Sequence, residues 1–164
     1  MSVIKRDERL YNLIFPVWML YTPLAAAVSP LIWGILLAGN FVWDSAVLLL
    51  AFFWMHLPQK GTLYRRAILR VWLCGFLADV VATLPYLVLM YTGIEPDFIS
   101  VYHPIDQVFM LPLVVLGGVL VYLFASRFAL RKTRLETAEI RRIARFLAVL
   151  TAPYTFLIPT SWLA

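Results

Sequence analysis

The fold of this chain is decided by residues 10–57, which read LYNLIFPVWMLYTPLAAAVSPLIWGILLAGNFVWDSAVLLLAFFWMHL. This apolar block holds 48 residues, and one transmembrane helix needs roughly 20. Basic residues flank it on both sides, at Lys5, Arg6 and Arg9 and again at Lys60 and Arg65. If both flanks are cytoplasmic, the block crosses the membrane an even number of times, and two crossings fit its length.

A turn between these two crossings is expected at Gly39 and Asn40, because both residue types adopt turn conformations at low cost. The pattern then predicts spans at about 11–38 and 41–57. Asn40 would cap the second helix, and Asp44 would lie in its first turns, near the outer surface.

Three further apolar segments predict spans at about 67–92, 107–126 and 143–162. The loop 93–106 contains acidic residues and no Lys or Arg. Residues 133–136 read TRLE, the pattern of a capping box, and predict the start of a helix that runs into the last span and ends near Pro159.

This arrangement places all 14 Lys and Arg residues on one side of the membrane. By the positive-inside rule, the N-terminus is then cytoplasmic and the C-terminus lies outside. The composition agrees, with 63% hydrophobic and 14% charged residues against about 25% charged in soluble domains. We therefore expect a single all-α domain over 1–164: a multi-pass helix bundle of about five transmembrane helices in the cytoplasmic membrane.

A cleaved signal peptide is the alternative for the N-terminal segment, since basic residues, an apolar run and the alanines 25–27 occur in that order. The apolar run continues well past the alanines, however, and Pro16 and Pro23 interrupt it. We expect an uncleaved first span.

Asp79 is the most informative candidate for chemistry, because it falls near the middle of the third predicted span. A central Asp costs on the order of 2.5–3.5 kcal/mol on insertion scales, so it should face protein or water. No Lys, Arg or His lies at that depth, which leaves Asp79 either protonated or solvated. We expect a proton or cation site, or else a neutral carboxyl that hydrogen-bonds across helices. The candidate residues around it are Asp79, Thr83, Tyr86, Tyr154 and Thr155.

Two other features have a simpler expected role. Asn40 and Asp44 are outer-surface polar candidates that either line an entrance for a cation or serve as a turn cap and an interfacial carboxylate. Gly117 and Gly118, with the small residues of the last span such as Ala148 and Ala152, are expected to allow close helix packing.

The connector after the fourth span is strongly basic. Its cations are expected to bind anionic lipid headgroups, or else an acidic partner protein. They are Arg127, Arg131, Lys132, Arg134, Arg141, Arg142 and Arg145. The net charge is +5, but the basic residues flank apolar spans, so nucleic acid is not an expected partner.

No pattern of a hydrolase, a metalloprotease or a nucleotide-binding loop occurs in the sequence, and no metal site or cofactor is expected. The first hypothesis is therefore a non-catalytic subunit or accessory component of a membrane complex, assembled with itself or with other chains. The second is a small oligomeric channel or transporter that uses Asp79. The third, an intramembrane enzyme acting on lipid, rests on unpaired carboxyls alone.

Overall fold

The structure is a computed structural model, and it describes residues 30–91 and 111–154. These residues are helical, with no strand among them. The helices are α2 (Pro30–Trp54), α3 (Lys60–Tyr91), α4 (Leu111–Phe124) and α5 (Thr137–Leu150). A π-helical turn, η3 (Ala125–Ala129), extends α4, and a 3₁₀ turn, η4 (Arg131–Thr133), follows it.

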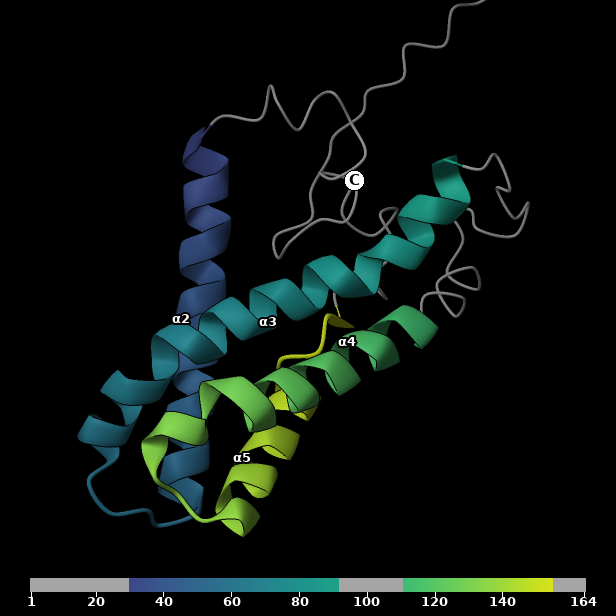
Figure 1. Cartoon of the computed structure of the whole chain (residues 1–164). Helices are drawn as coiled ribbons and strands as arrows, with labels where there is room; N and C mark the ends of the chain where they lie inside the picture. The colour runs from purple at the N-terminus through teal and green to yellow at the C-terminus, as the bar shows by residue number, and fades with distance from the viewer. Residues whose placement is uncertain (1–29, 92–110, 155–164) are drawn as a thin grey trace, which may run out of the picture.

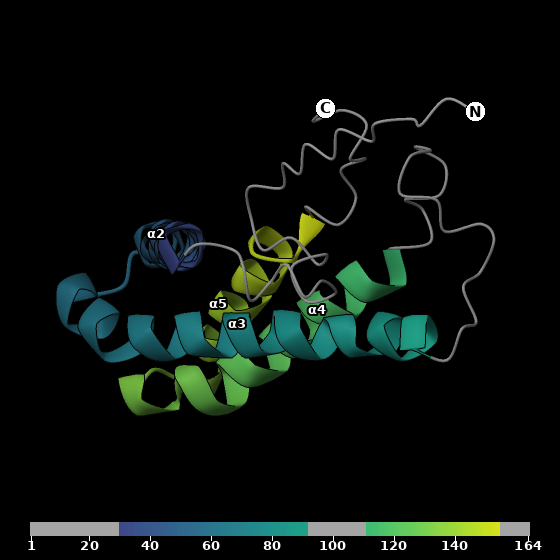
Figure 2. The same cartoon turned by 90° about the horizontal axis from the view of Figure 1, so that it is seen from above.

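The helices form a small bundle in which α3 and α4 run side by side in opposite directions (Figure 1). Seen from above, α2 lies almost end-on while α3 lies along its length, so α2 crosses α3 steeply (Figure 2). The short helix α5 packs against both α4 and α2. The core lies where these helices meet and includes Leu48, Phe52, Ile143 and Leu147, which are fully buried.

Three of the helical segments are long and apolar enough to cross a membrane: Leu37–Trp54, Lys60–Pro85 and Leu111–Thr133. Each exposes large apolar side chains, as a lipid-facing helix does, for example Leu50, Leu73 and Val115. Over the described residues, the prediction of a helical protein with membrane-spanning helices is therefore confirmed. The predicted third span falls inside α3 except for residue 92, which lies outside the described residues together with residues 11–29 of the first span and the loop 93–106.

The predicted turn at Gly39 and Asn40 is wrong, because α2 continues through both residues. A Gly inside a helix costs about 1 kcal/mol relative to Ala. Breaking the helix in lipid would instead leave backbone groups unpaired, at several kcal/mol each. Continuing the helix is the cheaper solution, so Asn40 lies in its interior and caps nothing.

The turn between α2 and α3 is formed instead at His56, whose φ of 51° is left-handed. The N–H of Leu57 donates to Phe52 O (3.1 Å) and that of His56 to Phe53 O (3.1 Å), the two bonds of a Schellman motif. The buried Leu57 completes the motif with an apolar contact. Five residues, 55–59, therefore suffice to reverse the chain.

The predicted capping box at 133–136 is displaced by three residues. Glu136 is the N-cap of α5, and its backbone N–H donates to the Glu139 carboxylate (2.9 Å). Thr133 cannot cap this helix because its hydroxyl donates to Leu130 O, and Arg134 then turns the chain with a φ of 61°. The box E-x-x-E replaces the predicted T-x-x-E.

The prediction that α5 runs on toward Pro159 is also wrong, because α5 ends at Leu150. Pro153 has no N–H to donate to Val149 O, and proline disfavours a helical residue before it. The Val149 carbonyl accepts the Tyr154 hydroxyl instead (2.6 Å), and the Leu150 carbonyl accepts Trp43 Nε1 (3.1 Å). Side chains thus satisfy two carbonyls that the helix leaves open.

The predicted close packing at Gly117 and Gly118 is confirmed. A Cβ on Gly117 would lie 2.8 Å from Pro153 Cδ, and one on Gly118 would lie 3.3 Å from Ala148 O. The absence of side chains at these positions is what lets α4 approach the end of α5 so closely.

Candidate functional site

The first residue of the candidate site, Asp44, lies in the middle of α2 rather than near an end. It shares one helix face with Val47, Leu48, Ala51 and Phe52, all of which are buried. Asp44 itself is only 2% exposed. A carboxyl thus occupies a position in the buried stripe of α2 that its neighbours fill with apolar side chains.

Helix α3 makes room for this carboxyl at Gly75. A Cβ on Gly75 would lie 3.3 Å from Asp44 Oδ2, so a larger residue would press on the carboxyl. Asp79 follows Gly75 by one helical turn and lies on the same face of α3. Asp79 therefore lies close enough to Asp44 for the two carboxyls to interact electrostatically.

Neither carboxyl has a basic partner among the residues that the structure describes. Asp44 Oδ2 and Asp79 Oδ1 are both buried and have no hydrogen-bond partner there. Arg70 precedes Asp79 by nine residues, which at 100° per residue puts it on the opposite face of α3. The bundle thus holds one buried acid, Asp44, and one half-buried acid, Asp79, and over 30–91 and 111–154 no cation pairs with them.

Two carboxyls in such a place cannot both carry a charge cheaply. Their mutual repulsion adds to the cost of removing each charge from water. A proton shared by the two carboxyls, or a cation bound between them, reduces this repulsion. In the described part of the chain, no group of three or more His, Cys, Asp or Glu residues is suited to a metal ion. A divalent cation of the Ca²⁺ type needs six to eight oxygens, more than two carboxyls supply, whereas a shared proton needs only one oxygen from each carboxyl.

The other predicted site residues are arranged as follows. Thr83 lies one turn beyond Asp79 and is fully buried, with its hydroxyl donating to Val80 O (2.8 Å). Asn40 lies one turn before Asp44 and is half-buried. Tyr86 belongs to α3, but its side chain is outside the described part, as is all of Thr155.

Tyr154 does not serve the carboxyls as the sequence suggested, because its hydroxyl donates to Val149 O. The structure therefore brings Asp44 to Asp79, which the sequence analysis had assigned to different depths. Asn40 lies one turn from Asp44 on α2 and Thr83 one turn from Asp79 on α3, each farther from the turn at 55–59 than its neighbouring carboxyl.

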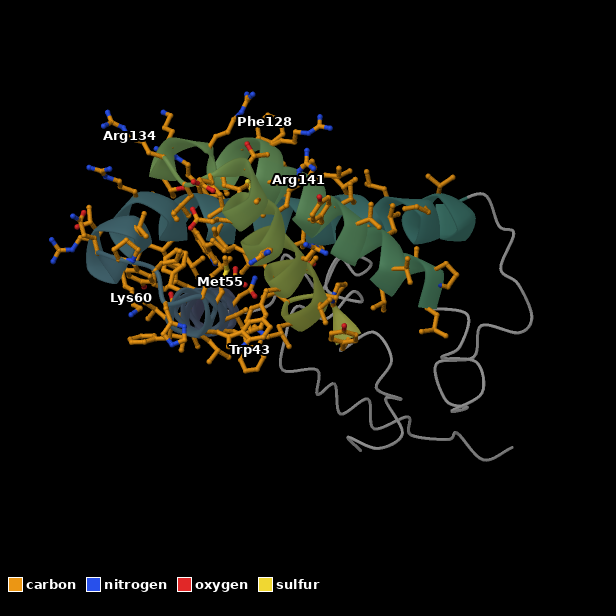
Figure 3. All side chains as sticks on the ribbon, turned by 90° about the horizontal axis from the view of Figure 1, so that it is seen from below. Trp43, Met55, Lys60, Phe128, Arg134 and Arg141 are labelled. Atoms are coloured by element: carbon orange, nitrogen blue, oxygen red, sulfur yellow. The ribbon has the colours of Figure 1, made fainter. Side chains whose placement is uncertain are left out.

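The basic residues of the connector are all exposed. The start of α3, the end of α4 and the start of α5 gather at one end of the bundle (Figure 1). Lys60 and Arg134 accordingly lie at the same end (Figure 3). The described basic residues of three segments thus share one side, as one membrane face requires.

No protein-family model, curated protein or solved structure matches this chain.

Proposed function

We propose that this protein is a small, oligomeric, non-catalytic channel or transporter of the cytoplasmic membrane, in which Asp44 and Asp79 bind a proton or a monovalent cation. The observation that carries the proposal is the proximity of two carboxyls, the buried Asp44 and the half-buried Asp79, each with a buried oxygen that has no hydrogen-bond partner in the described bundle. Intramembrane acids are found on ion pathways and in proton relays, so an acid at such a position is a functional-site hypothesis. The proximity of Asp44 to Asp79 favours a channel or transporter over an accessory subunit.

The proposed topology has five spans, with the N-terminus cytoplasmic and the C-terminus outside. In this topology α2, residues 30–54, is the second crossing of the block 10–57. The first crossing must therefore end before Pro30. The gathering of basic residues at one end of the bundle supports this orientation.

Oligomerisation is part of the proposal, because a single short bundle offers little room for alternating access. Leu69, Leu73, Leu77 and Leu84 project from α3 at helical spacing, and all of them are exposed. Such a stripe suits contact with another apolar helix as well as with lipid.

The test is ion flux in liposomes that contain the purified protein. We expect a proton or Na⁺ gradient to drive a measurable flux, and we expect Asp44→Asn and Asp79→Asn each to abolish it. Glu136→Gln is the matched control, since it also removes one carboxylate, but at an exposed position. Circular dichroism shows whether each variant keeps its helices. Flux that survives either Asp substitution, or an absence of flux in the wild type, would overturn the proposal.

A second candidate is an accessory subunit of a larger membrane complex, favoured by the exposed leucines of α3. Purification in mild detergent at native expression levels distinguishes it. Stoichiometric partner proteins would support the subunit, whereas a homo-oligomer without partners would support the channel or transporter.

A further inference from the structure

A cavity of about 810 Å³ lies between the C-terminal part of α2 and α5. One wall contains Ala51 and Trp54 of α2 and Met55 of the following turn, and the other contains Phe146 and Val149 of α5. Figure 3 shows Met55 close to the point where α2 passes α5. The volume is typical of ligand cavities, which hold roughly 300–1,000 Å³.

The lining of this cavity changes from charged to apolar along α5. Glu139, Arg142 and Arg145 line it from the first turn of α5 to just past the middle of this helix, whose start belongs to the basic end of the bundle. Val149 and Leu150 line it one to two turns further along the helix. The order matches a phospholipid, whose charged headgroup lies at the membrane surface and whose acyl chain lies deeper.

The two arginines are free to bind an anion. Both are exposed, and neither forms an ion pair within the described residues. The Nε of Arg145 donates to Arg141 O (3.3 Å), which leaves its terminal nitrogens available. Arginine is well suited to phosphate, because its planar group donates two parallel hydrogen bonds.

Glu139 does not compete for these arginines, because its carboxylate accepts the Glu136 N–H at the start of α5 (2.9 Å). With Glu139 counted, the charged side chains facing the cavity carry a net charge of +1. This charge complements the single negative charge of one phosphodiester. A choline headgroup would instead bring a third cation beside the two arginines.

An aromatic pair closes one side of the apolar part. The rings of Trp54 and Phe146 lie 5.5 Å apart between centroids, with 38° between their planes. Rigid aromatic walls bury much apolar area at little cost in side-chain entropy, and tryptophan favours the membrane interface.

We propose that this cavity binds one anionic phospholipid. The phosphodiester lies between Arg142 and Arg145, and an acyl chain lies along Phe146 and Val149. The site is independent of the carboxyl pair between α2 and α3, so it does not depend on the proposed ion flux.

The test is the binding of phosphatidylglycerol to the full-length protein in detergent micelles, followed by native mass spectrometry. We expect saturation at one lipid per chain. The double variant Arg142→Gln/Arg145→Gln should weaken binding about tenfold or more, because each arginine loses charge-assisted hydrogen bonds to the phosphate. Val149→Trp keeps every charge and should weaken binding by narrowing the apolar part.

The matched control is Arg131→Gln/Arg134→Gln, which removes the same charge from exposed residues that do not line the cavity. Its effect should stay below about twofold, because these two residues do not line the cavity and an exposed charge acts only weakly at a distance. Equal weakening by both double variants would show general electrostatic attraction and overturn the proposal. So would equal binding of phosphatidylcholine, or displacement of the lipid by inorganic phosphate at comparable concentration. If the arginine variant does not fold, the Val149→Trp variant and the phosphatidylcholine comparison decide the outcome.

Discussion

Replacing Gly117 with alanine tests the packing of α4 on the end of α5. The new Cβ would lie 2.8 Å from Pro153 Cδ and 2.9 Å from Pro153 Cγ, closer than carbon atoms normally approach. The proline ring cannot rotate away, and Ala82 Cβ at 3.6 Å limits movement of α4 toward α3. Overpacking of this kind costs about 1–3 kcal/mol, whereas alanine in place of glycine stabilises a helix by about 1 kcal/mol. We therefore expect a net loss of about 1 kcal/mol in the free energy of unfolding.

Gly39→Ala is the matched control, because a Cβ there meets nothing within 4 Å. It gains the same helix propensity from alanine without the steric clash, so it should raise the free energy of unfolding by up to about 1 kcal/mol. The difference between the two variants, about 1–3 kcal/mol, isolates the contact with Pro153. The measurement is unfolding in mixed micelles with a rising fraction of SDS, followed by circular dichroism. Equal stabilities for the two variants would refute the packing argument. Destabilisation by Gly39→Ala would refute a continuous α2.

Three other substitutions test the turns, the helix contacts and the orientation. His56→Gly should stabilise the protein by about 1 kcal/mol in the same unfolding assay, because the φ of 51° suits glycine; a loss of stability would contradict the left-handed turn. Trp43→Phe should lower the free energy of unfolding by about 0.5–1.5 kcal/mol, because Leu150 O loses its hydrogen-bond donor. An unchanged free energy of unfolding would show that this hydrogen bond does not stabilise the protein. Ala138→Cys in a Cys74→Ser background should resist an impermeant thiol reagent in intact cells and react after permeabilisation; labelling in intact cells would reverse the proposed orientation.

The sequence predicted those features that depend on composition and local residue size. Apolar length identified α3 and α4 as spans, and the small residues Gly117 and Gly118 identified a close packing surface. Helix boundaries were predicted less well, because each depended on a competition between two local signals. Glycine and asparagine favour a turn, but an apolar surrounding penalises broken backbone hydrogen bonds more strongly, and α2 continues.

The carboxyl pair could not be predicted because the depth assigned to Asp44 depended on that boundary. A turn at Gly39 put Asp44 in the first turns of a helix, where a carboxylate interacts favourably with the positive end of the dipole. The continuous α2 puts it in mid-helix against Gly75, where no dipole end compensates its charge. Apolar residues of similar size would stabilise that position more than an unpaired acid does. A bundle that keeps two such acids near enough to repel each other gives up stability there, and the binding of a proton or a cation is the compensation that the local chemistry favours.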